Sequence, residues 1–474
     1  MPVVAVVRER AWEIIALVIA DVPPRTCVPV VPLGSDQVAG ARWVSVEGGA
    51  RLSGEIRTSG AKNAATKMMA SALLTSEPVV LENVPSIDAI KTQSALLMGL
   101  GASVDWDATR HTVTIVAEHL NGDRLIESLA SRERASFVMT GPLLARLGHV
   151  EAPRPGGCKL GARPVNVDIR GFQAMGATVT QVDTAYEIRA SRLTGANLYL
   201  DYPSHTGTEN LMMAACLAVG TTTIKNASCE PEVVALAHHL NRMGARIRGA
   251  GTPKIEIQGV ERLHGVQTRV IPDRIEAGSF AIAAAATGGE VTIRDVIPEH
   301  LDPVIYKLVE CGASVAVTRN SLSIRSDGPL RPVEIQAIHY PGFPTDLQTP
   351  FGALLTQAHG ESIIHERVFE SRFRYVDELR ALGASITTNG EVGARETETA
   401  TRAYIYGPTQ LRGSRVRALD LRCGLALIIA GLCASGETQI ADFQHAERGY
   451  QDLADRLRSL GAHLKVHGDP VSIA

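Results

Sequence analysis

Three short segments contain residues suited to chemistry on an anionic substrate. Cys158 lies in the glycine- and proline-rich stretch PRPGGCKLGARP, whose basic residues favour a thiolate. Lys62 and Asn63 follow a Ser-Gly turn at the expected start of a helix, a natural place to bind an anion. Asp346 lies in the proline-rich turn YPGFPTDLQ. Each also has a structural explanation: a packed cysteine, a solvated lysine, and an N-cap for the following helix.

Arginines near the ends of predicted elements form a second group of candidates. Each one alone is explained by surface exposure or packing. Several together could converge on a phosphorylated ligand, because guanidinium groups bind phosphate and carboxylate through paired hydrogen bonds. The group, with one neighbouring aspartate, comprises Arg134, Arg372, Asp420, Arg422 and Arg448.

The elements that must position these residues repeat six times along the chain. An apolar residue followed by Gly-Ala and an extended apolar stretch recurs with its glycines at Gly101, Gly176, Gly244, Gly312, Gly383 and Gly461. A β-branched segment such as GTTTIKNA, at Gly220, precedes each of these signals. The pattern predicts a β-α-β-α-β-β-like unit of about 70 residues, with glycines at the helix ends.

Composition limits the class of protein. A chain of 474 residues, 45% hydrophobic and 20% charged, can bury a large core and favours two or three domains. Its net charge of -3 argues against a general nucleic-acid surface, and no segment predicts a membrane span. The seven cysteines lack metal-like spacing, which favours a reduced, cytoplasmic protein. Residues 1–42 do not fit the repeat and are expected to be a disordered extension, with a targeting or partner helix as the alternative.

No motif predicts a metal or a redox cofactor, and we expect none. His238 and His239 are adjacent, so a helix would point their rings in different directions, and we expect both on a helix surface. The pairs Gly99–Gly101 and Gly249–Gly251 lack the third glycine and the acidic partner of a dinucleotide site.

Eight separated motifs, in the same order, resemble the enolpyruvyl transferase family over nearly all of residues 43–467. They are SGAKNAA, RASFVMTGPLLARLG, PGGCKLGARP, PDRIEAG, FPTDLQ, FESRF, DLR and ERGY. The resemblance implies an α/β fold, namely a two-domain inside-out α/β barrel of six repeated units with the active site in the interdomain cleft. It places residues 62–271 in the first three-repeat domain and residues 43–61 plus 272–467 in the second.

The resemblance also implies a reaction. In this family, phosphoenolpyruvate donates its enolpyruvyl group to a hydroxyl, here expected to be the 3-hydroxyl of UDP-N-acetylglucosamine in peptidoglycan precursor synthesis, and phosphate is released. The methylene carbon needs a proton, the hydroxyl needs a base, and the anionic groups need cations. By the resemblance, Cys158 is the general acid and the target of fosfomycin, Asp346 is the base, and Lys62 is a catalytic cation.

The other matched positions are implied to bind or orient the substrates. Domain closure is expected to bring Cys158 and Asp346 together and to expel water. The expected substrate-binding residues are Asn63, Arg134, Arg163, Pro164, Val165, Asn166, Ser204, Val368, Arg372, Asp420, Arg422 and Arg448.

The chain departs from the family pattern on the acceptor side. Asn166 and Asp168 stand where the family usually has aspartate and histidine, and near the expected diphosphate Tyr202 replaces a lysine and His205 an apolar residue. These changes are either ordinary variation or signs of another uridine nucleotide, such as UMP in nucleoside-antibiotic biosynthesis. The shikimate-phosphate branch fits less well because it lacks the PGGC loop. A non-catalytic repeat scaffold is the alternative from another class, and retention of the candidate site residues argues against it.

Overall fold

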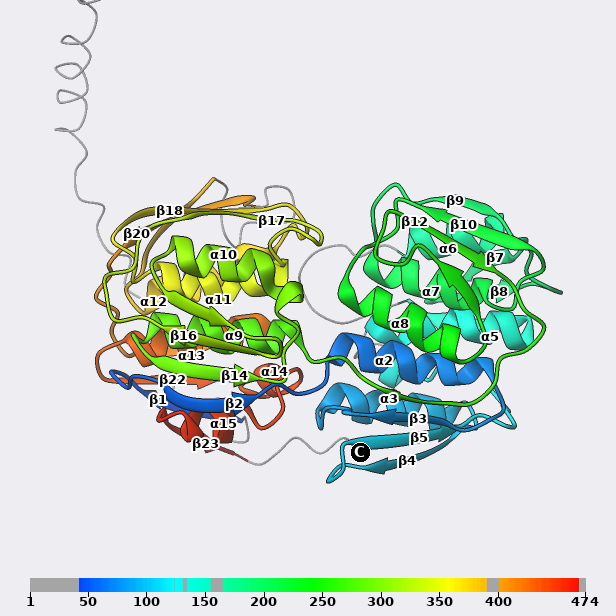
Figure 1. Ribbon diagram of the computed structural model, residues 1–474, viewed down its shortest axis with the longest axis horizontal. Helices are drawn as coiled ribbons and strands as arrows, with labels where there is room; N and C mark the ends of the chain where they lie inside the picture. Colours follow the sequence, from blue (N-terminus) through cyan, green and yellow to red (C-terminus); the bar gives the residue numbers. More distant parts are fainter. Residues whose placement is uncertain (1–41, 123, 131–133, 155–164, 390–399, 469–474) are drawn as a thin grey trace, which may run out of the picture. The chain divides into compact units, whose positions relative to one another are not determined.

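A computed structural model describes residues 42–122, 124–130, 134–154, 165–389 and 400–468, and for residues 134 and 135 only the backbone (Figure 1). Ala41–Ala474 form one compact unit. The predicted N-terminal extension, residues 1–42, lies outside the described residues except for Arg42.

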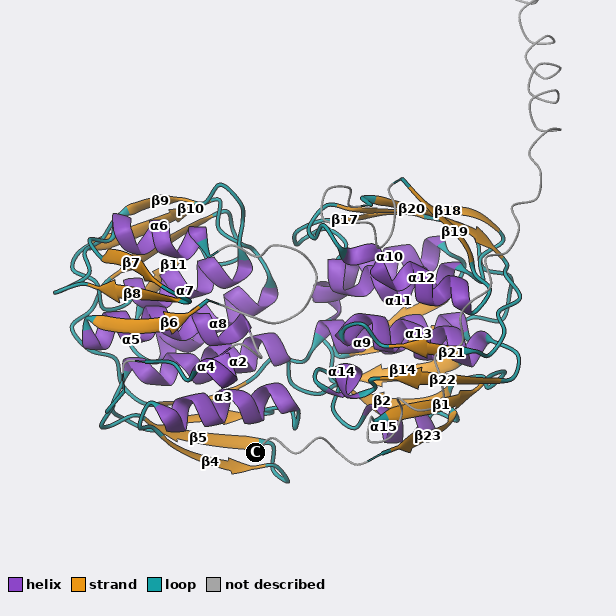
Figure 2. Ribbon diagram, turned by 180° about the vertical axis from the view of Figure 1, so that it is seen from behind, coloured by secondary structure: helices purple, strands orange, loops and turns teal. Residues whose placement is uncertain are grey.

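The described strands form six small sheets, five mixed sheets of four strands and one antiparallel sheet of three. In each four-stranded sheet, one parallel pairing is followed by two antiparallel pairings. Figures 1 and 2 show the sheets on the outside and the helices inside. The structure confirms the predicted α/β unit, and the six sheets remain separate rather than joining into a closed barrel.

Three groups, each made of one sheet and its helices, lie between residues 62 and 269. The first contains α2 (Lys62–Ser71), η2 (Ala72–Leu74), β3 (Val79–Glu82), α3 (Asp88–Gly99), β4 (Ser103–Asp107), β5 (Thr112–Val116) and β13 (Val266–Arg269). The second contains α4 (Glu127–Ala130), η3 (Arg134–Met139), α5 (Thr140–Leu147), β6 (His149–Pro153), α6 (Asn166–Ala174), β7 (Thr178–Val182) and β8 (Ala185–Arg189). The third contains β9 (Asn197–Tyr199), α7 (His205–Ala215), β10 (Thr221–Lys225), α8 (Pro231–Arg242), β11 (Arg246–Arg248) and β12 (Lys254–Gln258).

Three further groups, each made of one sheet and its helices, contain the remaining strands. The fourth contains β2 (Ser53–Arg57), α9 (Arg274–Ala286), β14 (Glu290–Arg294), η4 (Pro298–Leu301), α10 (Asp302–Glu310), β15 (Ser314–Val317) and β16 (Ser321–Arg325). The fifth contains β17 (Glu334–Ala337), α11 (Thr345–Leu355), β18 (Gly360–Glu366), η5 (Arg372–Arg374), α12 (Tyr375–Ala381), β19 (Ser385–Thr388) and β20 (Arg402–Gly407). The sixth contains β1 (Trp43–Glu47), β21 (Arg415–Arg417), α13 (Leu421–Cys433), β22 (Glu437–Ala441), α14 (Gln444–Glu447), α15 (Leu453–Ser459) and β23 (His463–His467).

The six Gly-Ala glycines all adopt the backbone conformation that the sequence predicts. Their φ angles lie between +93° at Gly176 and +105° at Gly312. A residue with a side chain is strained in this left-handed region, whereas glycine is not. Each glycine therefore ends a helix and turns the chain into the next strand.

The buried apolar side chains form two clusters. One runs from Ala61 to Val270, and the other combines Val44–Ile56 with Ile275–Leu464. Every residue of α9 is buried, and so are Arg422–Leu432 of α13, which explains why the segments Phe280–Ala286 and Cys423–Cys433 contain no charged residue. The two domains predicted from the resemblance, with boundaries at 61/62 and 271/272, remain a proposal.

Two chain segments run side by side near residues 60 and 272. Gly60 forms a bridge with Pro272, the Ala61 N–H donates to the Ile271 carbonyl at 2.8 Å, and the Asp273 N–H donates to the Ser59 carbonyl at 2.9 Å. This pairing fixes the starts of α2 and α9 next to each other. It thereby brings the Lys62 segment and the PDRIEAG motif together, although they are far apart in sequence.

The helices also bear on the question of membrane association. No helix in the described ranges combines the length and the apolar character needed to cross a bilayer.

Candidate active site

Asp346 lies between two buried arginines. Its Oδ1 accepts a hydrogen bond from Arg372 Nη2 at 2.8 Å, and its Oδ2 accepts from Arg422 Nη2 at 2.9 Å and Nε at 3.2 Å. The arginine side chains are 1% and 7% exposed, whereas Asp346 retains 29%. We call these three residues the Asp346 centre. A carboxylate held this way is fixed in orientation and still reachable by a ligand.

The three residues come from three separate elements of the 272–467 region. Asp346 is the second residue of α11, Arg372 opens η5, and Arg422 is the second residue of α13. The N-cap of α11 is Pro344, so the structural explanation of Asp346 as the N-cap was wrong. The two carboxylate oxygens of Asp346 instead accept hydrogen bonds from Arg372 and Arg422.

Aromatic rings and acids keep both arginines charged. Burial opposes the charged form of Arg422, but Tyr450 and Asp346 outweigh it and raise its pKa. The Arg422 guanidinium also lies over the Tyr450 ring, 5.2 Å from its centroid. For Arg372 the opposing burial is outweighed by Asp346, with help from Asp420, and its pKa is also raised. The Asp346 centre therefore carries fixed positive charge at any physiological pH.

Asp420 has a structural role next to this centre. Its side chain is the N-cap of α13 and accepts from the backbone N–H groups of Arg422 at 2.8 Å and Cys423 at 2.9 Å. An N-cap fixes the first turn of its helix. Asp420 thus sets the position of Arg422, and its predicted role in orienting reactants stays a prediction.

Lys62 lies at the start of α2, as predicted, next to a residue that the sequence reasoning missed. Asp273 caps α9 through Oδ1, which accepts from Ile275 N and Glu276 N, and its Oδ2 accepts from Lys62 N at 3.2 Å. Burial and the nearby Glu276 raise the pKa of Asp273 to about 6. Arg422 also acts on this carboxyl, so Asp273 links the Lys62 helix to the Asp346 centre.

The sequence analysis also missed an ion pair that involves Arg274, the residue after Asp273. Arg274 binds Glu232 through Nε at 3.1 Å and Nη2 at 3.2 Å, and both side chains are buried. Burial opposes the Glu232 carboxylate, but Arg274 outweighs it and lowers its pKa to about 2. Both Asp273 and Arg274 lie in PDRIEAG, one of the eight motifs of the resemblance, but the sequence analysis predicts no role for either residue. The Pro-Asp start of this motif is also an N-cap signal.

Other predicted substrate-binding residues lie at helix starts. Ser204 is the N-cap of α7 and accepts from the Gly207 N–H at 3.1 Å. Val165 is the buried N-cap residue of α6, and the exposed Asn166 is its first residue. Asn63 is the second residue of α2 and is partly exposed. All four lie at helix starts, where backbone N–H groups suit an anionic ligand.

Two more predicted residues lie in turns of the 272–467 region. Val368 is partly buried, and its N–H donates to Glu366 Oε1 at 2.7 Å. Arg448 follows α14 and is partly exposed. It lies two residues before Tyr450, whose ring contacts Arg422 of the Asp346 centre.

Several site predictions lie outside the described residues. They are Cys158, Arg163 and Pro164. Arg134 opens η3, but only its backbone is described. The predicted approach of Cys158 to Asp346 therefore stays a prediction.

Two of the residues that depart from the family pattern have defined contacts. Asp168 is buried and accepts from Asn210 Nδ2 at 2.7 Å. Tyr202 packs edge-on against His339, with ring centroids 4.6 Å apart.

His239 corrects one sequence expectation. It is fully buried and pairs with Ser71 Oγ at 2.9 Å, whereas a surface position was predicted. Burial lowers its pKa to about 4. The prediction was wrong because α8 packs between α2 and α7, so that only His238 faces solvent.

Comparison with known proteins identifies the family. The family model for EPSP synthase (3-phosphoshikimate 1-carboxyvinyltransferase) matches residues 46–457. The chain belongs to the enolpyruvyl transferase family. UDP-N-acetylglucosamine 1-carboxyvinyltransferase 2 of Carboxydothermus hydrogenoformans is 46% identical over 425 residues, covering 89% of this chain and 98% of the relative. UDP-N-acetylglucosamine 1-carboxyvinyltransferase 1 of Caldanaerobacter subterraneus subsp. tengcongensis is 43% identical over 419 residues, covering 88% and 98%.

Solved structures agree with this membership. The enolpyruvyl transferase NikO from Streptomyces tendae superposes with a TM-score of 0.80 at 28% identity, covering 91% of this chain and all of NikO. EPSP synthase from Acinetobacter baumannii, at 17% identity and a TM-score of 0.68 over 90% of this chain and all of that structure, supports the fold alone. The chain is a carboxyvinyl transferase that acts on small molecules, which argues against the scaffold alternative.

Proposed function

We propose that this enolpyruvyl transferase moves the enolpyruvyl group of phosphoenolpyruvate to the 3-hydroxyl of UDP-N-acetylglucosamine, in the cytoplasm, as a step of peptidoglycan precursor synthesis. The observation that carries the proposal is the Asp346 centre: a partly exposed carboxylate whose position is fixed by two buried arginines. The relatives at 43% and 46% identity, both named for this acceptor, support the choice of substrate.

The proposed reaction begins with addition. Asp346 takes the proton of the acceptor hydroxyl, whose oxygen bonds to C2 of phosphoenolpyruvate, while Cys158 supplies a proton to the methylene carbon C3. The product is a tetrahedral intermediate. In the elimination step, C3 returns its proton to Cys158, the C2–C3 double bond re-forms, and the C2–O bond to phosphate breaks, while the leaving phosphate or solvent takes the proton held by Asp346.

The cations have a separate role in this proposal. Lys62, Arg134, Arg163, Arg422 and Arg448 would hold the phosphate and carboxylate of the donor, while Asn63, Arg372 and Asp420 would orient the reactants. Pro164, Val165, Asn166, Ser204 and Val368 would contact the acceptor. Fixed guanidinium groups stabilise the charge that develops on the leaving phosphate, without reorganising during the reaction.

The experiment that tests the proposal compares acceptors. The purified full chain is incubated with phosphoenolpyruvate and either UDP-N-acetylglucosamine or UMP, while phosphate release and product mass are recorded. We expect phosphate release with UDP-N-acetylglucosamine and a product heavier by one enolpyruvyl group in place of a hydrogen. Turnover with UMP alone would replace this acceptor by the second candidate below.

The second candidate is UMP, in nucleoside-antibiotic biosynthesis. Tyr202 stands where the resemblance expects a lysine near a second phosphate, and a smaller acceptor would not need that cation. NikO, an enolpyruvyl transferase that is 28% identical, shows that the fold is shared by relatives other than those named for UDP-N-acetylglucosamine.

The role proposed for Cys158 has its own test. Fosfomycin should alkylate the wild-type chain at Cys158, and Cys158→Ala should lose both the adduct and most of the turnover. Cys229→Ala is the matched control, because Cys229 is partly exposed and burial with the nearby Glu230 raises its pKa. An adduct of equal yield in Cys158→Ala, detected by mass spectrometry, contradicts the assignment.

A further inference from the structure

A second acid lies between two bases, in the 62–271 region. Glu209 of α7 is fully buried, with Lys67 Nζ 3.5 Å from Oε2 and His205 Nε2 3.2 Å from Oε1. Within the described residues, neither carboxylate oxygen makes a hydrogen bond of good geometry. We call these three residues the Glu209 centre. A buried carboxylate with only ion pairs to balance it depends strongly on the charge of both partners.

Around this centre, acidic side chains outnumber the basic side chains other than His205. Three acids face the region: Glu209, Glu230 before α8, and Glu232 of α8. Two other basic side chains lie among them, Lys67 of α2 and Arg274 of α9. An imidazolium at His205 supplies the missing positive charge.

The directions of the pKa shifts of three histidines also favour a positive charge on His205. Burial opposes the charged ring of His205, but Glu209 outweighs it and raises the pKa. His339, from the segment before α11, is the other histidine that acts on His205, and burial lowers its pKa. His300, close to Glu232 and Arg274, has a pKa lowered by burial as well. The positive charge therefore belongs on His205.

The position of His205 suits an anionic ligand. It is the first residue of α7, directly after the cap Ser204, where the helix dipole favours negative charge. Its Nε2 is buried against Glu209, but 23% of the side chain is exposed. The His205 side chain, which follows Ser204 directly in the chain, is therefore partly accessible to a ligand.

We propose that His205 is a specificity-determining residue, an imidazolium held in place by Glu209 that binds a phosphate of the uridine-nucleotide acceptor. This inference rests on the proposed function, which places the acceptor at Ser204. The ring can form a charge-assisted hydrogen bond that an apolar side chain at this position cannot form. As the pH rises and His205 loses its proton, acceptor affinity should fall while donor affinity stays constant.

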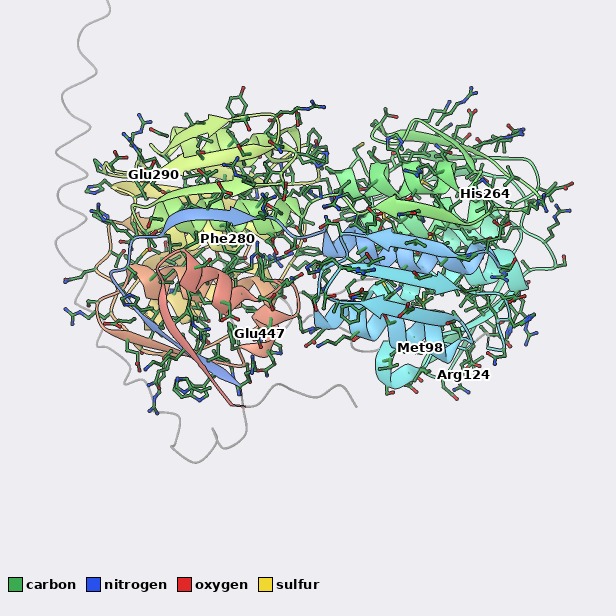
Figure 3. The ribbon with its side chains drawn as sticks, turned by 60° about the horizontal axis from the view of Figure 1, so that its bottom comes forward. Met98, Arg124, His264, Phe280, Glu290 and Glu447 are labelled. Carbon is green, nitrogen blue, oxygen red and sulfur yellow. The ribbon has the colours of Figure 1, made fainter. Side chains whose placement is uncertain are left out.

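The kinetic test measures KM for each substrate between pH 6 and 9 in the wild type and in His205→Gln. UDP-N-acetylglucosamine is the suitable probe because its diphosphate diester does not titrate in this range. At pH 6.5 we expect His205→Gln to raise the acceptor KM about tenfold, the effect of losing one charge-assisted hydrogen bond, with kcat and the phosphoenolpyruvate KM nearly unchanged. The variant should also lose the pH dependence of the acceptor KM. His264→Gln is the matched control, an exposed histidine of the same region, labelled in Figure 3.

A binding measurement separates this inference from the proposed function. The ring-proton NMR signal of His205, identified by its loss in His205→Gln, is titrated with pH in the presence of UMP or of uridine. We expect a higher pKa with UMP, because only UMP carries a phosphate. An equal pKa with both ligands, or an unchanged acceptor KM in His205→Gln of an active enzyme, overturns the inference. If no uridine nucleotide supports turnover, the proposed function fails, and the UMP-uridine difference still decides whether His205 binds phosphate.

Discussion

The Asp346 centre and the Glu209 centre both hold an acid between two bases, yet they differ in exposure and in the kind of base. Asp346 is 29% exposed and is bound by two arginines at 2.8–3.2 Å. Glu209 is fully buried, with ion-pair distances of 3.2 Å to one histidine and 3.5 Å to one lysine. An arginine pair fixes a carboxylate that a substrate can still reach, whereas a lysine and a histidine leave a charge balance that protonation can change. The first centre suits chemistry, and the second suits recognition.

The largest effect is expected at Asp346. Asp346→Asn keeps the size of the side chain but removes the base, so turnover should fall by about 10²–10⁴-fold while phosphoenolpyruvate still binds. Steady-state phosphate release and donor binding by calorimetry measure the two quantities. Full activity in this variant would assign the base elsewhere and remove the functional contrast between the centres.

The buried acid should matter more for stability. Among the described residues, Lys67→Met leaves Glu209 with His205 as its remaining basic partner, and we expect the free energy of unfolding to fall by about 3 kcal/mol. Denaturant titration checks this value. Arg170→Met is the control, since the Arg170–Asp201 pair is 71% and 73% exposed and should contribute little. Equal losses in the two variants would show that Glu209 does not depend on Lys67.

Arginine geometry is the next test of the Asp346 centre. Arg422→Lys keeps the charge but cannot reproduce the two donors that Arg422 directs to Oδ2, so kcat/KM should fall by about 10–100-fold. Arg415→Lys, at an exposed position on β21, should behave like the wild type. A fall confined to stability, with kcat/KM preserved, would mean that charge alone is sufficient at Arg422.

The smallest effect concerns a histidine of the same region that, unlike His205, is neutral. The folded pKa of His239 is about 4, below the ordinary value of 6.5. As the pH falls through 6.5, the unfolded chain takes up a proton that the folded protein does not, so stability falls until about pH 4. Between pH 8 and pH 5 the wild type should lose about 2 kcal/mol more than His239→Gln. Parallel denaturation curves at both pH values would contradict a neutral, buried His239.

Local sequence signals predicted most of the repeated fold. The six Gly-Ala signals predicted helix ends, and every one of these glycines adopts a left-handed conformation. This succeeds because the requirement for glycine depends on the backbone of a few neighbouring residues. The helix start at Lys62 could be predicted for the same reason.

Strand partners were beyond these local signals. Strand β2 pairs with β14, β13 pairs with β3, and β1 lies between β22 and β23, each across more than 180 residues of sequence. The repeat alone would assign each strand to its nearest unit. Pairing across such distances depends on the path of the whole chain, and no local pattern encodes it.

The candidate site divides in a similar way. Residue type and turn chemistry were enough to select Asp346, Lys62 and the arginines, because carboxylate, ammonium and guanidinium groups carry their chemistry wherever they lie. The burial and the partners of these side chains could not be predicted from the sequence. The sequence did not show which arginines bind Asp346, that Asp273 joins two helices, or that His239 is buried while His238 is exposed. Those properties come from contacts between elements that are distant in sequence, where packing decides the dielectric environment and the partner of each charge.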